Sequence, residues 1–526
     1  MSKLPKIGAI DPWRVALDTE IVRRGGLAVV LEQELRPKRG QRHWLSWEGF
    51  LVILMLTVRS QSFTFEEMAA CYWRLPEAAR RAFGEPHARS KVRPGRTGGS
   101  DDTVLNHLHV KWDLFRQYFD SSPVTRAFLE PDDRSRLNER RAVLLDRHAS
   151  GLLPPLFHDA HVQDGTAVDG FRNRFLGGCP HQRLGHRTPT KSDPREKVFG
   201  FCLVCIGGAS IDDEYLVPGV VRHHELVPAN ESEGEVTLRL YRRHVKTCSL
   251  RHVIGDRHIS YSPYDFSTRL VALGARPVHD LHVHLQKQRG IFQRFLVIDC
   301  WLWHPDLPTP FWKLPNAPKY RKAGRWRSCY AAHLLADPTL DHPAALVGCP
   351  GRAYGPSHPA TLNCPGTRAR GDQVVDKAPI VERCIDSEVC AQPQGVDLPL
   401  VDDRGEPTDF GRGYQVYPRL SPEWVAIYGR LRALIENVFS SLTTRKGANV
   451  AQNTHSIWGL PGVALWAATA VAIHNHQRLW RVLKKPSKRT RLHPDDLEAL
   501  TTSILFADRD VLSEHYERLF PGAVRP

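Results

Sequence analysis

Three acidic residues of the sequence stand where carboxylates could act together. Asp256 closes the short apolar run of LRHVIGD and Asp164 that of HVQDG, so each is expected at the end of a strand. Glu436 lies in YGRLRALIENVF, which has the apolar spacing of a helix. Acids on two strand ends and one helix can converge on two divalent cations, and oxygen ligands suit Mg²⁺ or Mn²⁺. Two such ions about 4 Å apart can activate a nucleophile and stabilise the leaving oxygen of a phosphodiester.

Two further side chains share the predicted helix of Glu436. Tyr428, Arg432 and Glu436 follow one another at intervals of four residues, so they are expected along one face of the helix. An arginine and a tyrosine beside a catalytic carboxylate could hold DNA phosphates next to the scissile bond. The spacing therefore predicts a contact with DNA phosphates beside the predicted metal site.

Other aspartates compete for two of the three positions, and any one strand-end aspartate can be purely structural. Asp159 and Asp169 are alternatives to Asp164; Asp159 is five residues earlier, so on a regular strand it points to the opposite face. Asp299 in RFLVIDCW is an alternative to Asp256. It follows a good apolar strand but leads directly into a segment rich in tryptophan and proline.

The charge of the chain favours a polyanionic partner. The 526 residues carry a formal net charge of +15, while the hydrophobic (41%) and charged (25%) fractions are those of an ordinary globular protein. A basic excess of this size points first to nucleic acid. A basic surface without a specific partner is the alternative.

The sequence offers no segment that calls for a membrane. The stretch Met1–Ile10 lacks the apolar core of a signal peptide, which predicts a cytoplasmic protein. The uncharged run Ser456–Ile473 is near membrane-spanning length, but glycine and proline interrupt its start and polar residues close it, so a buried helix beginning near Pro461 is expected. Eleven cysteines without an export signal indicate reduced thiols or a metal site.

Patterns along the chain change twice. Residues 1–150 have helical spacing, as in WLSWEGFLVILMLTV and DDTVLNHLHVKWDLFRQYF, where Asp101 and Asp102 could form an N-cap. From about Pro154, short apolar runs such as KVFGFCLVCIGG and RHVIGD predict strands of a mixed sheet. Seventeen of the 39 prolines fall between Pro305 and Pro422, which excludes long helices there and predicts an irregular, strand-rich insertion.

Together these residues resemble the DDE transposases of bacterial insertion sequences. The resemblance lies in DGTAV at Asp164, GDRHI at Asp256, YGRLRALIE at Tyr428–Glu436, SPEWVAIY before that helix, and two CP pairs in the insertion. It is to the group whose last acid stands in a Tyr/Arg/Glu helix after a strand-rich insertion, and to its actinobacterial members.

The resemblance implies an α/β fold: a ribonuclease-H-like mixed sheet core with a strand-rich insertion and an N-terminal helical domain. It also implies Mg²⁺- or Mn²⁺-dependent cutting and joining of double-stranded DNA at transposon ends and target, with Asp164, Asp256 and Glu436 as both catalytic residues and ligands of two ions. A homodimer in the synaptic complex and association with the bacterial nucleoid follow from the same resemblance.

Five segments are expected on this basis. They are a helical domain binding transposon ends (1–150), the first part of the catalytic core (151–283), the Pro/Cys-rich β insertion (284–421), the second part of the core (422–482), and a basic tail with a short helical appendage (483–526).

The chain departs from the pattern of this group at several positions. Gly429 stands where the group has its tyrosine, and Tyr428 comes one residue earlier. Thr443 replaces a usual lysine, for which the nearby Arg445 and Lys446 could substitute. The common DRAY or DRGY reads DRHI here. The candidate DNA-binding residues are Tyr428, Arg432, Arg257, Arg445 and Lys446.

The cysteines of the insertion could hold a structural Zn²⁺. They are Cys349, Cys364, Cys384 and Cys390, and their spacings of 15, 20 and 6 are not the tight pairs of zinc ribbons. Unligated thiols are the alternative. Cys202 and Cys205 form a C-x-x-C inside a strand-like run, which puts them on opposite faces and predicts core residues.

Three functions fit the sequence. An active DDE transposase agrees best with the three acids. A non-catalytic DNA-binding protein on a decayed or repurposed transposase scaffold is the alternative from another class. A ribonuclease-H-like nuclease without strand transfer is opposed by the insertion and the N-terminal helices.

Overall fold

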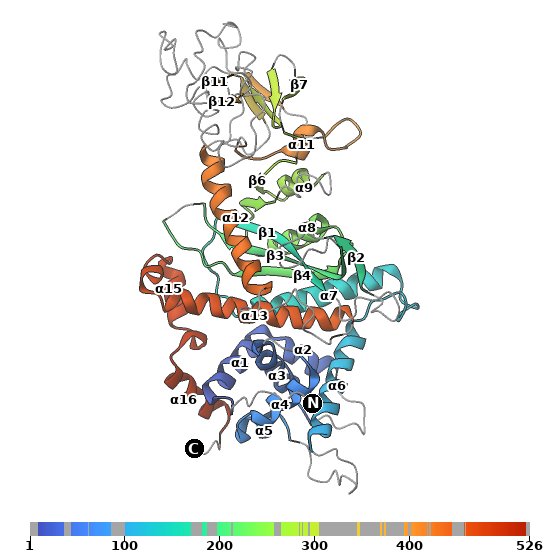
Figure 1. The fold of residues 1–526 in the computed structure, drawn as a ribbon, viewed down its shortest axis with the longest axis vertical. Helices are drawn as coiled ribbons and strands as arrows, with labels where there is room; N and C mark the ends of the chain where they lie inside the picture. The colour runs from blue at the N-terminus through green and yellow to red at the C-terminus, as the bar shows by residue number, and fades with distance from the viewer. Residues whose placement is uncertain are drawn as a thin grey trace. The chain divides into compact units, whose positions relative to one another are not determined.

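The structure is a computed structural model of an α/β protein (Figure 1). It describes residues 9–35, 44–60, 63–85, 100–169, 181–186, 197–211, 214–256, 265–282, 284–286, 288–292, 295–303, 344–347, 369–370, 373–374, 394–397, 401–417, 419, 422–443, 457 and 459–521.

The chain divides into two compact units that do not follow the five predicted segments. Unit 1 comprises Met1–His158, Gly165–Glu231 and Glu436–Pro526; unit 2 comprises Asp159–Asp164 and Ser232–Ile435. The N-terminal helices do not stand apart, because they share a core with strands and with the C-terminal helices. One strand and one helix, β1 and α12, run through the boundary.

Unit 1 begins with seven helices. They are α1 Pro12–Gly25, α2 Leu27–Glu34, α3 Trp47–Arg59, α4 Phe65–Arg74, α5 Glu77–Phe83, α6 Ser100–Phe119 and α7 Pro131–Ser150. Helix α3 is buried on every side from Gly49 to Val58, as its apolar sequence predicts. Helix α6 starts at Ser100, so Asp101 and Asp102 lie in its first turn and do not form its N-cap.

The C-terminal part of unit 1 contains α13 Leu460–Leu483, α14 Pro486–Arg489, α15 Pro494–Thr501, a 3₁₀ turn Ile504–Phe506 and α16 Arg509–Leu519. Helix α13 is buried from Leu460 to His476 and packs against α3, α7 and strand β4. The predicted buried helix near Pro461 is therefore confirmed. No helix in the described part of the chain is long and apolar enough to cross a membrane.

Polar residues at the end of this buried stretch of α13 hold the strand beside it. Asn475 accepts a hydrogen bond from the backbone N–H of Val221 (2.7 Å) and donates to its carbonyl (2.8 Å). His474 contacts the Ser441 hydroxyl (2.7 Å), and His476 contacts the carbonyl of Leu505 (2.9 Å). Buried polar groups require such partners, and these bonds fix the position of α13.

The strands of unit 1 are antiparallel. They are β2 Arg183–His186, β3 Lys197–Ala209 and β4 Val221–Pro228, with Leu184 opposite Phe199 and Leu203 opposite Leu226. Cys205 on β3 is fully buried and Cys202 partly buried. This agrees with the prediction that the C-x-x-C belongs to a strand in the core.

The strands of unit 2 that form its sheet are parallel. Strand β1 Ala160–Asp169 pairs with β5 His252–Gly255, and β5 pairs with β6 Arg276–His279. The helices α8 Glu233–His244 and α9 Phe266–Ala272 precede β5 and β6 in the chain, since parallel strands need long connections. The whole sheet has the order β2-β3-β1-β5-β6, with β4 on β3.

The described residues of the proline-rich segment form mainly short antiparallel strands. They are β7 Gln288–Phe292, β8 Phe295–Ile298 and β9 Trp301–Trp303, then β10 Ala344–Val347 paired with β13 Gln394–Asp397, and β11 Ala369–Arg370 paired with β12 Gln373–Val374. A short helix, α11 Asp409–Gly413, precedes the long α12 Pro422–Thr443.

Three buried histidines make unit 1 sensitive to acid. Burial lowers the pKa of His148, His474 and His476 to about 4, against roughly 6.5 in an unfolded chain. The unfolded chain therefore binds these protons more tightly, and the free energy of unfolding should fall as the pH drops from about 6.5 to about 4. The loss is on the order of 3 kcal/mol per histidine.

Urea unfolding followed by circular dichroism at a series of pH values measures this loss. His476→Asn removes one titrating group and should flatten the pH dependence. A denaturation midpoint that stays constant from pH 7 to pH 5 would show that the fold does not lower the pKa of these histidines.

Candidate functional site

Two of the predicted acids belong to neighbouring parallel strands of unit 2: Asp164 lies within β1, and Asp256 comes directly after β5. Ala160 is opposite His252 and Val162 is opposite Ile254, where the pairing of the two strands ends. Extended by two residues, this register would set Asp164 opposite Asp256. Neighbouring strands are about 4.8 Å apart, and opposed residues of a parallel pair face the same side. Both aspartates are partly exposed, so they form an accessible pair of carboxylates.

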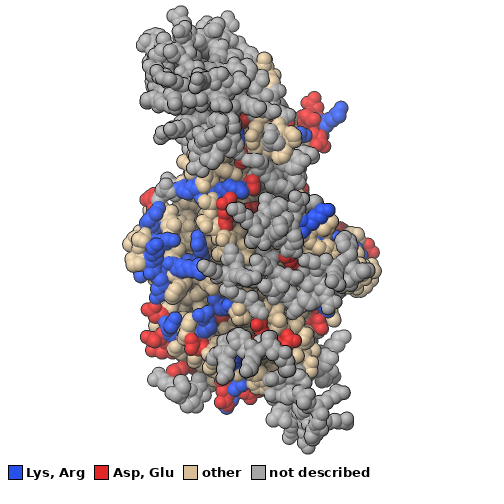
Figure 2. All heavy atoms as spheres, in the orientation of Figure 1, with Lys and Arg blue, Asp and Glu red and all other residues tan. Residues whose placement is uncertain are grey.

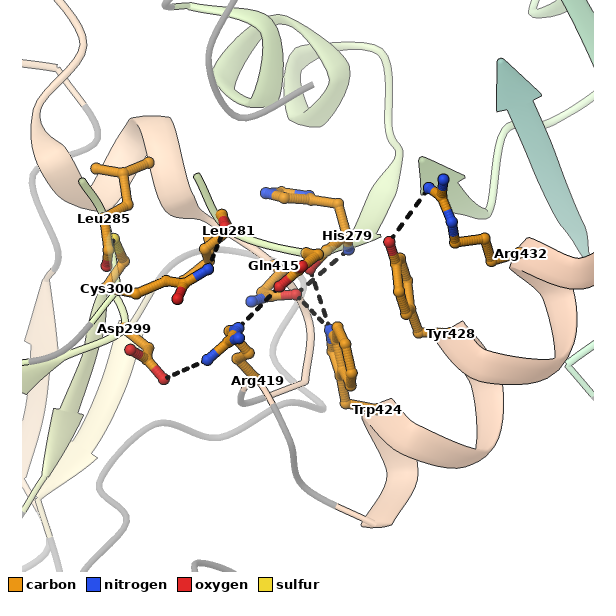
Figure 3. Close-up of polar contacts among 12 residues, drawn as sticks. His279, Leu281, Leu285, Asp299, Cys300, Gln415, Arg419, Trp424, Tyr428 and Arg432 are labelled. Atoms are coloured by element: carbon orange, nitrogen blue, oxygen red, sulfur yellow. Dashed lines mark hydrogen bonds and ion pairs between the residues drawn. The ribbon is translucent and has the colours of Figure 1, made fainter. Parts of the chain in front are cut away.

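Arg432 of α12 contacts Asp256. Its Nη2 donates to Oδ2 of Asp256 over 3.0 Å. Its Nη1 donates to the Tyr428 hydroxyl over 3.4 Å (Figure 3). Burial raises the pKa of Tyr428 to about 12, so the hydroxyl keeps its proton. Burial alone would lower the pKa of Arg432, but Tyr428 and Asp256 together raise it. A permanent positive charge therefore stands beside Asp256.

The start of α12 is fixed by Trp424. Its indole N–H donates to the carbonyl of His279 (3.1 Å) and to Oε1 of Gln415 (3.0 Å), and the same Oε1 accepts from the backbone N–H of His279 (3.3 Å). The Trp424 ring stacks on that of Tyr428 with centroids 4.4 Å apart. Figure 3 shows this series from the end of β6 to Arg432. These contacts position Arg432 against Asp256.

The buried Arg419 holds the segment of the chain just before α12. Nε of Arg419 donates to Oδ1 of Asp280 over 2.8 Å, and its Nη1 is 3.7 Å from Oδ2 of Asp299. Asp299 and Cys300 have φ of 52° and 62°, which is uncommon for residues with a side chain. A Cβ atom at Gly413 would overlap the Cys300 sulfur. Asp299, the rival of Asp256, is thus buried in an ion pair that holds the chain before α12.

The other rivals of Asp164 are placed differently from it. Asp169 is buried at the end of β1, and Asp159 precedes the strand. Asp164 lies where β1 becomes partly exposed. Of these three, Asp164 alone stands opposite Asp256 in the register of the two strands.

Glu436 is an exposed residue of α12, one turn beyond Arg432. It belongs to unit 1, whereas the aspartates, Tyr428 and Arg432 belong to unit 2. The structure therefore brings four of the predicted residues together within unit 2 and places Glu436 only along its helix. Thr443, at the position of the expected lysine, donates its hydroxyl proton to the Phe439 carbonyl (2.8 Å).

Several predicted residues lie outside the part of the chain that the structure describes. They are Arg257, Arg445, Lys446, Cys349, Cys364, Cys384 and Cys390. Their DNA-binding and zinc-binding roles stay predictions.

Histidines near β1 were not predicted to have a role. In unit 2 the buried rings of His161 and His244 have centroids 4.3 Å apart. His158, which would complete a set of three possible metal ligands, belongs to unit 1, so neither unit contains the whole set. The sequence signal for this group is the H-x-x-H spacing of HDAH. Gln415 and Trp424 had no signal as positioning residues, since their partner His279 is far away in the sequence.

No protein-family model, curated protein or solved structure matches the chain.

The indole N–H of Trp424 should contribute measurably to stability. Trp424→Phe keeps the ring stacking but leaves two buried acceptors, the His279 carbonyl and Gln415 Oε1, without this donor. Leaving a buried polar group unsatisfied costs about 1–3 kcal/mol, and the free energy of unfolding in urea should fall by that amount. Trp480→Phe is the matched control, because Trp480 is 41% exposed, and it should change stability by less than about 0.5 kcal/mol. Equal effects of the two substitutions would contradict the stabilising role of the hydrogen bonds that the Trp424 indole N–H donates.

Proposed function

We propose that the chain is a DDE-type DNA transposase with a ribonuclease-H-like core, a metal-dependent enzyme that cuts and joins transposon ends. The observation that supports the proposal is the parallel pairing of β1 with β5, whose register, extended by two residues, would set Asp164 opposite Asp256. A mixed sheet with the first two acids on adjacent strands is the arrangement that the sequence resemblance implies. The net charge of +15 fits a DNA partner.

The residues present suit Mg²⁺ or Mn²⁺. Asp164 and Asp256 are oxygen donors, partly exposed and one strand spacing apart. With Glu436 they would hold two ions. When bound, such ions supply activation of the attacking oxygen and stabilisation of the leaving oxygen in an in-line displacement.

The remaining side chains would bind and orient the DNA. The planar guanidinium of Arg432 can hold a phosphate through two parallel hydrogen bonds. Tyr428 and Trp424 fix the direction of that guanidinium, since one N–H donates to the tyrosine hydroxyl and the tyrosine ring stacks on the indole. Arg432 is therefore held at the aspartate pair before DNA arrives, which reduces the entropy lost on binding.

The chemistry would proceed in two displacements at phosphorus. In the first, water attacks the scissile phosphate, loses a proton and breaks the bond to the 3′ oxygen. In the second, the 3′-hydroxyl so freed attacks a target phosphate and displaces another 3′ oxygen. Each step exchanges one P–O bond for another, so no external energy source is needed. The same carboxylates would serve both steps.

Replacing Glu436 separates chemistry from binding. Glu436→Gln keeps the size of the side chain but removes one negative metal ligand, so cleavage of transposon-end DNA with Mg²⁺ should fall by at least about 100-fold. Affinity for the same DNA should stay within about twofold, because phosphate contacts come from Lys and Arg. Glu498→Gln, the same change at an exposed position of α15, should alter neither.

Unchanged cleavage by the Glu436→Gln protein would show that Glu436 is an ordinary surface carboxylate and would remove the catalytic triad. If the unsubstituted protein binds DNA but cleaves it with neither Mg²⁺ nor Mn²⁺, the alternative of a non-catalytic DNA-binding protein is favoured.

Replacing Arg432 should weaken binding and cleavage together. Arg432→Ala removes one phosphate contact, so the slope of log affinity against log salt should become shallower by about 0.9. The measurement is end-DNA affinity across salt, paired with strand cleavage. Arg430→Ala, two residues away on the same helix and pointing elsewhere, is the control. A full loss of cleavage with an unchanged salt slope would show that Arg432 positions the aspartates and does not bind a DNA phosphate.

A further inference from the structure

The end of α13 and the α14 segment carry a dense group of positive charges. Seven of the fourteen residues from Arg478 to Arg491 are lysine or arginine, and none is acidic. We call this group the α13–α14 basic surface; it consists of Arg478, Arg481, Lys484, Lys485, Lys488, Arg489 and Arg491. Figure 2 shows basic side chains gathered on one face over this end of α13.

Most of these charges lack acidic partners. Lys484 pairs with Asp508, whereas Arg481, Lys485, Lys488 and Arg489 form no ion pair with any acid that the structure describes.

The acids that follow in α15 are engaged elsewhere. Asp495 pairs with His493, and Asp496 accepts from the backbone N–H of Phe157. Burial, and then the neighbouring charge of Arg481, lower the pKa of Arg478. Like charges are therefore crowded at Arg478 and Arg481.

The helix dipole explains only part of this group. The negative end of a helix stabilises cations within its last turn, and Arg481 and Lys484 satisfy that requirement at the end of α13. Lys485, Lys488 and Arg489 lie beyond the helix and are exposed. Their charges therefore remain available to an anionic partner.

The basic surface is fixed to unit 1 and is not a solvated tail. Helix α13 is buried up to His476, and the carbonyl of Arg491 accepts a hydrogen bond from Leu216 (2.6 Å). The backbone N–H of Lys488 donates to the carbonyl of Lys485 (2.9 Å). Because the backbone that carries these charges is already ordered, binding need not order it, which favours a repeated array of anions as the partner.

The apolar surroundings exclude a bilayer as the best partner. A helix that lies on a membrane needs a broad exposed apolar face. Among the described residues of this segment, Trp480 is the one large apolar side chain that is well exposed, and Lys484 already lies over its ring, 5.6 Å from the centroid. A polyanion without an apolar phase, such as the backbone of a duplex, fits better.

We infer that the α13–α14 basic surface binds the phosphate backbone of double-stranded DNA, independently of sequence. The choice of DNA over other polyanions rests on the proposed function. The surface is distinct from Arg432, because it belongs to unit 1 and needs neither metal nor the aspartate pair. It would let the protein hold flanking or target DNA while the catalytic residues engage a transposon end.

Charge reversal tests the inference in EDTA, where no DNA is cut. The test protein carries Lys485→Glu, Lys488→Glu and Arg489→Glu. The control carries Arg136→Glu, Lys197→Glu and Arg518→Glu, which are exposed and scattered over unit 1 and change the net charge equally. Anisotropy of a fluorescent duplex of arbitrary sequence gives the affinity across a series of salt concentrations, and thermal unfolding by circular dichroism verifies that both proteins are folded.

The test protein should bind the duplex at least about tenfold more weakly than the control. Its salt slope should be shallower by about 3, or 0.9 for each of three lost phosphate contacts. Equal affinities and slopes for the two proteins would overturn the inference. So would a test protein that binds duplex normally but no longer binds vesicles of anionic phospholipid.

The proposed function can fail separately. If the test protein loses duplex binding while Glu436→Gln cleaves normally, the surface stands and the transposase chemistry falls. If Glu436→Gln abolishes cleavage and the test and control proteins bind alike, the reverse holds.

Discussion

Two carboxylates set side by side on parallel strands are the constraint on which the candidate site depends. Extended by two residues, the register of β1 and β5 would set Asp164 and Asp256 one strand spacing apart, where like charges repel in the absence of a cation. Arg432 offsets part of that repulsion by donating to Asp256. A slip of one residue between β1 and β5 would turn one aspartate to the other face. The site therefore exists only in this register, which the parallel pairing of β5 with β6 also supports.

The return of the chain after the long insertion is the second requirement. Loop closure costs little more for a long segment than for a short one, so the difficulty lies in placing α12 correctly at the end. Trp424 and Gln415 solve this by bonding to His279 at the end of β6. These contacts join the last strand of the parallel sheet directly to the helix that carries Tyr428 and Arg432.

Local sequence patterns predicted helices and strands, whereas contacts between residues far apart in the sequence could not be predicted. The strand end before Asp256 could be predicted because apolar runs that stop at a polar residue report burial locally. Helix α13 could be predicted for the same reason. The strand end predicted at Asp164 was wrong, because β1 continues to Asp169. The bonds of Trp424 to His279 join residues 145 positions apart, and no spacing rule encodes such a pair. The bond of Asn475 in α13 to Ala149, 326 positions away, is another pair that no local pattern encodes.

The ion pair between Asp280 and Arg419 joins two points 139 residues apart, one just after β6 and one just before α12. This ion pair therefore joins the start and the end of the insertion, and Asp299, just after β8, lies 3.7 Å from Arg419. The described strands further along, β10 with β13 and β11 with β12, pair only with each other. Loss of the ion pair between Asp280 and Arg419 would therefore free the segment that leads into α12, the helix that carries Arg432.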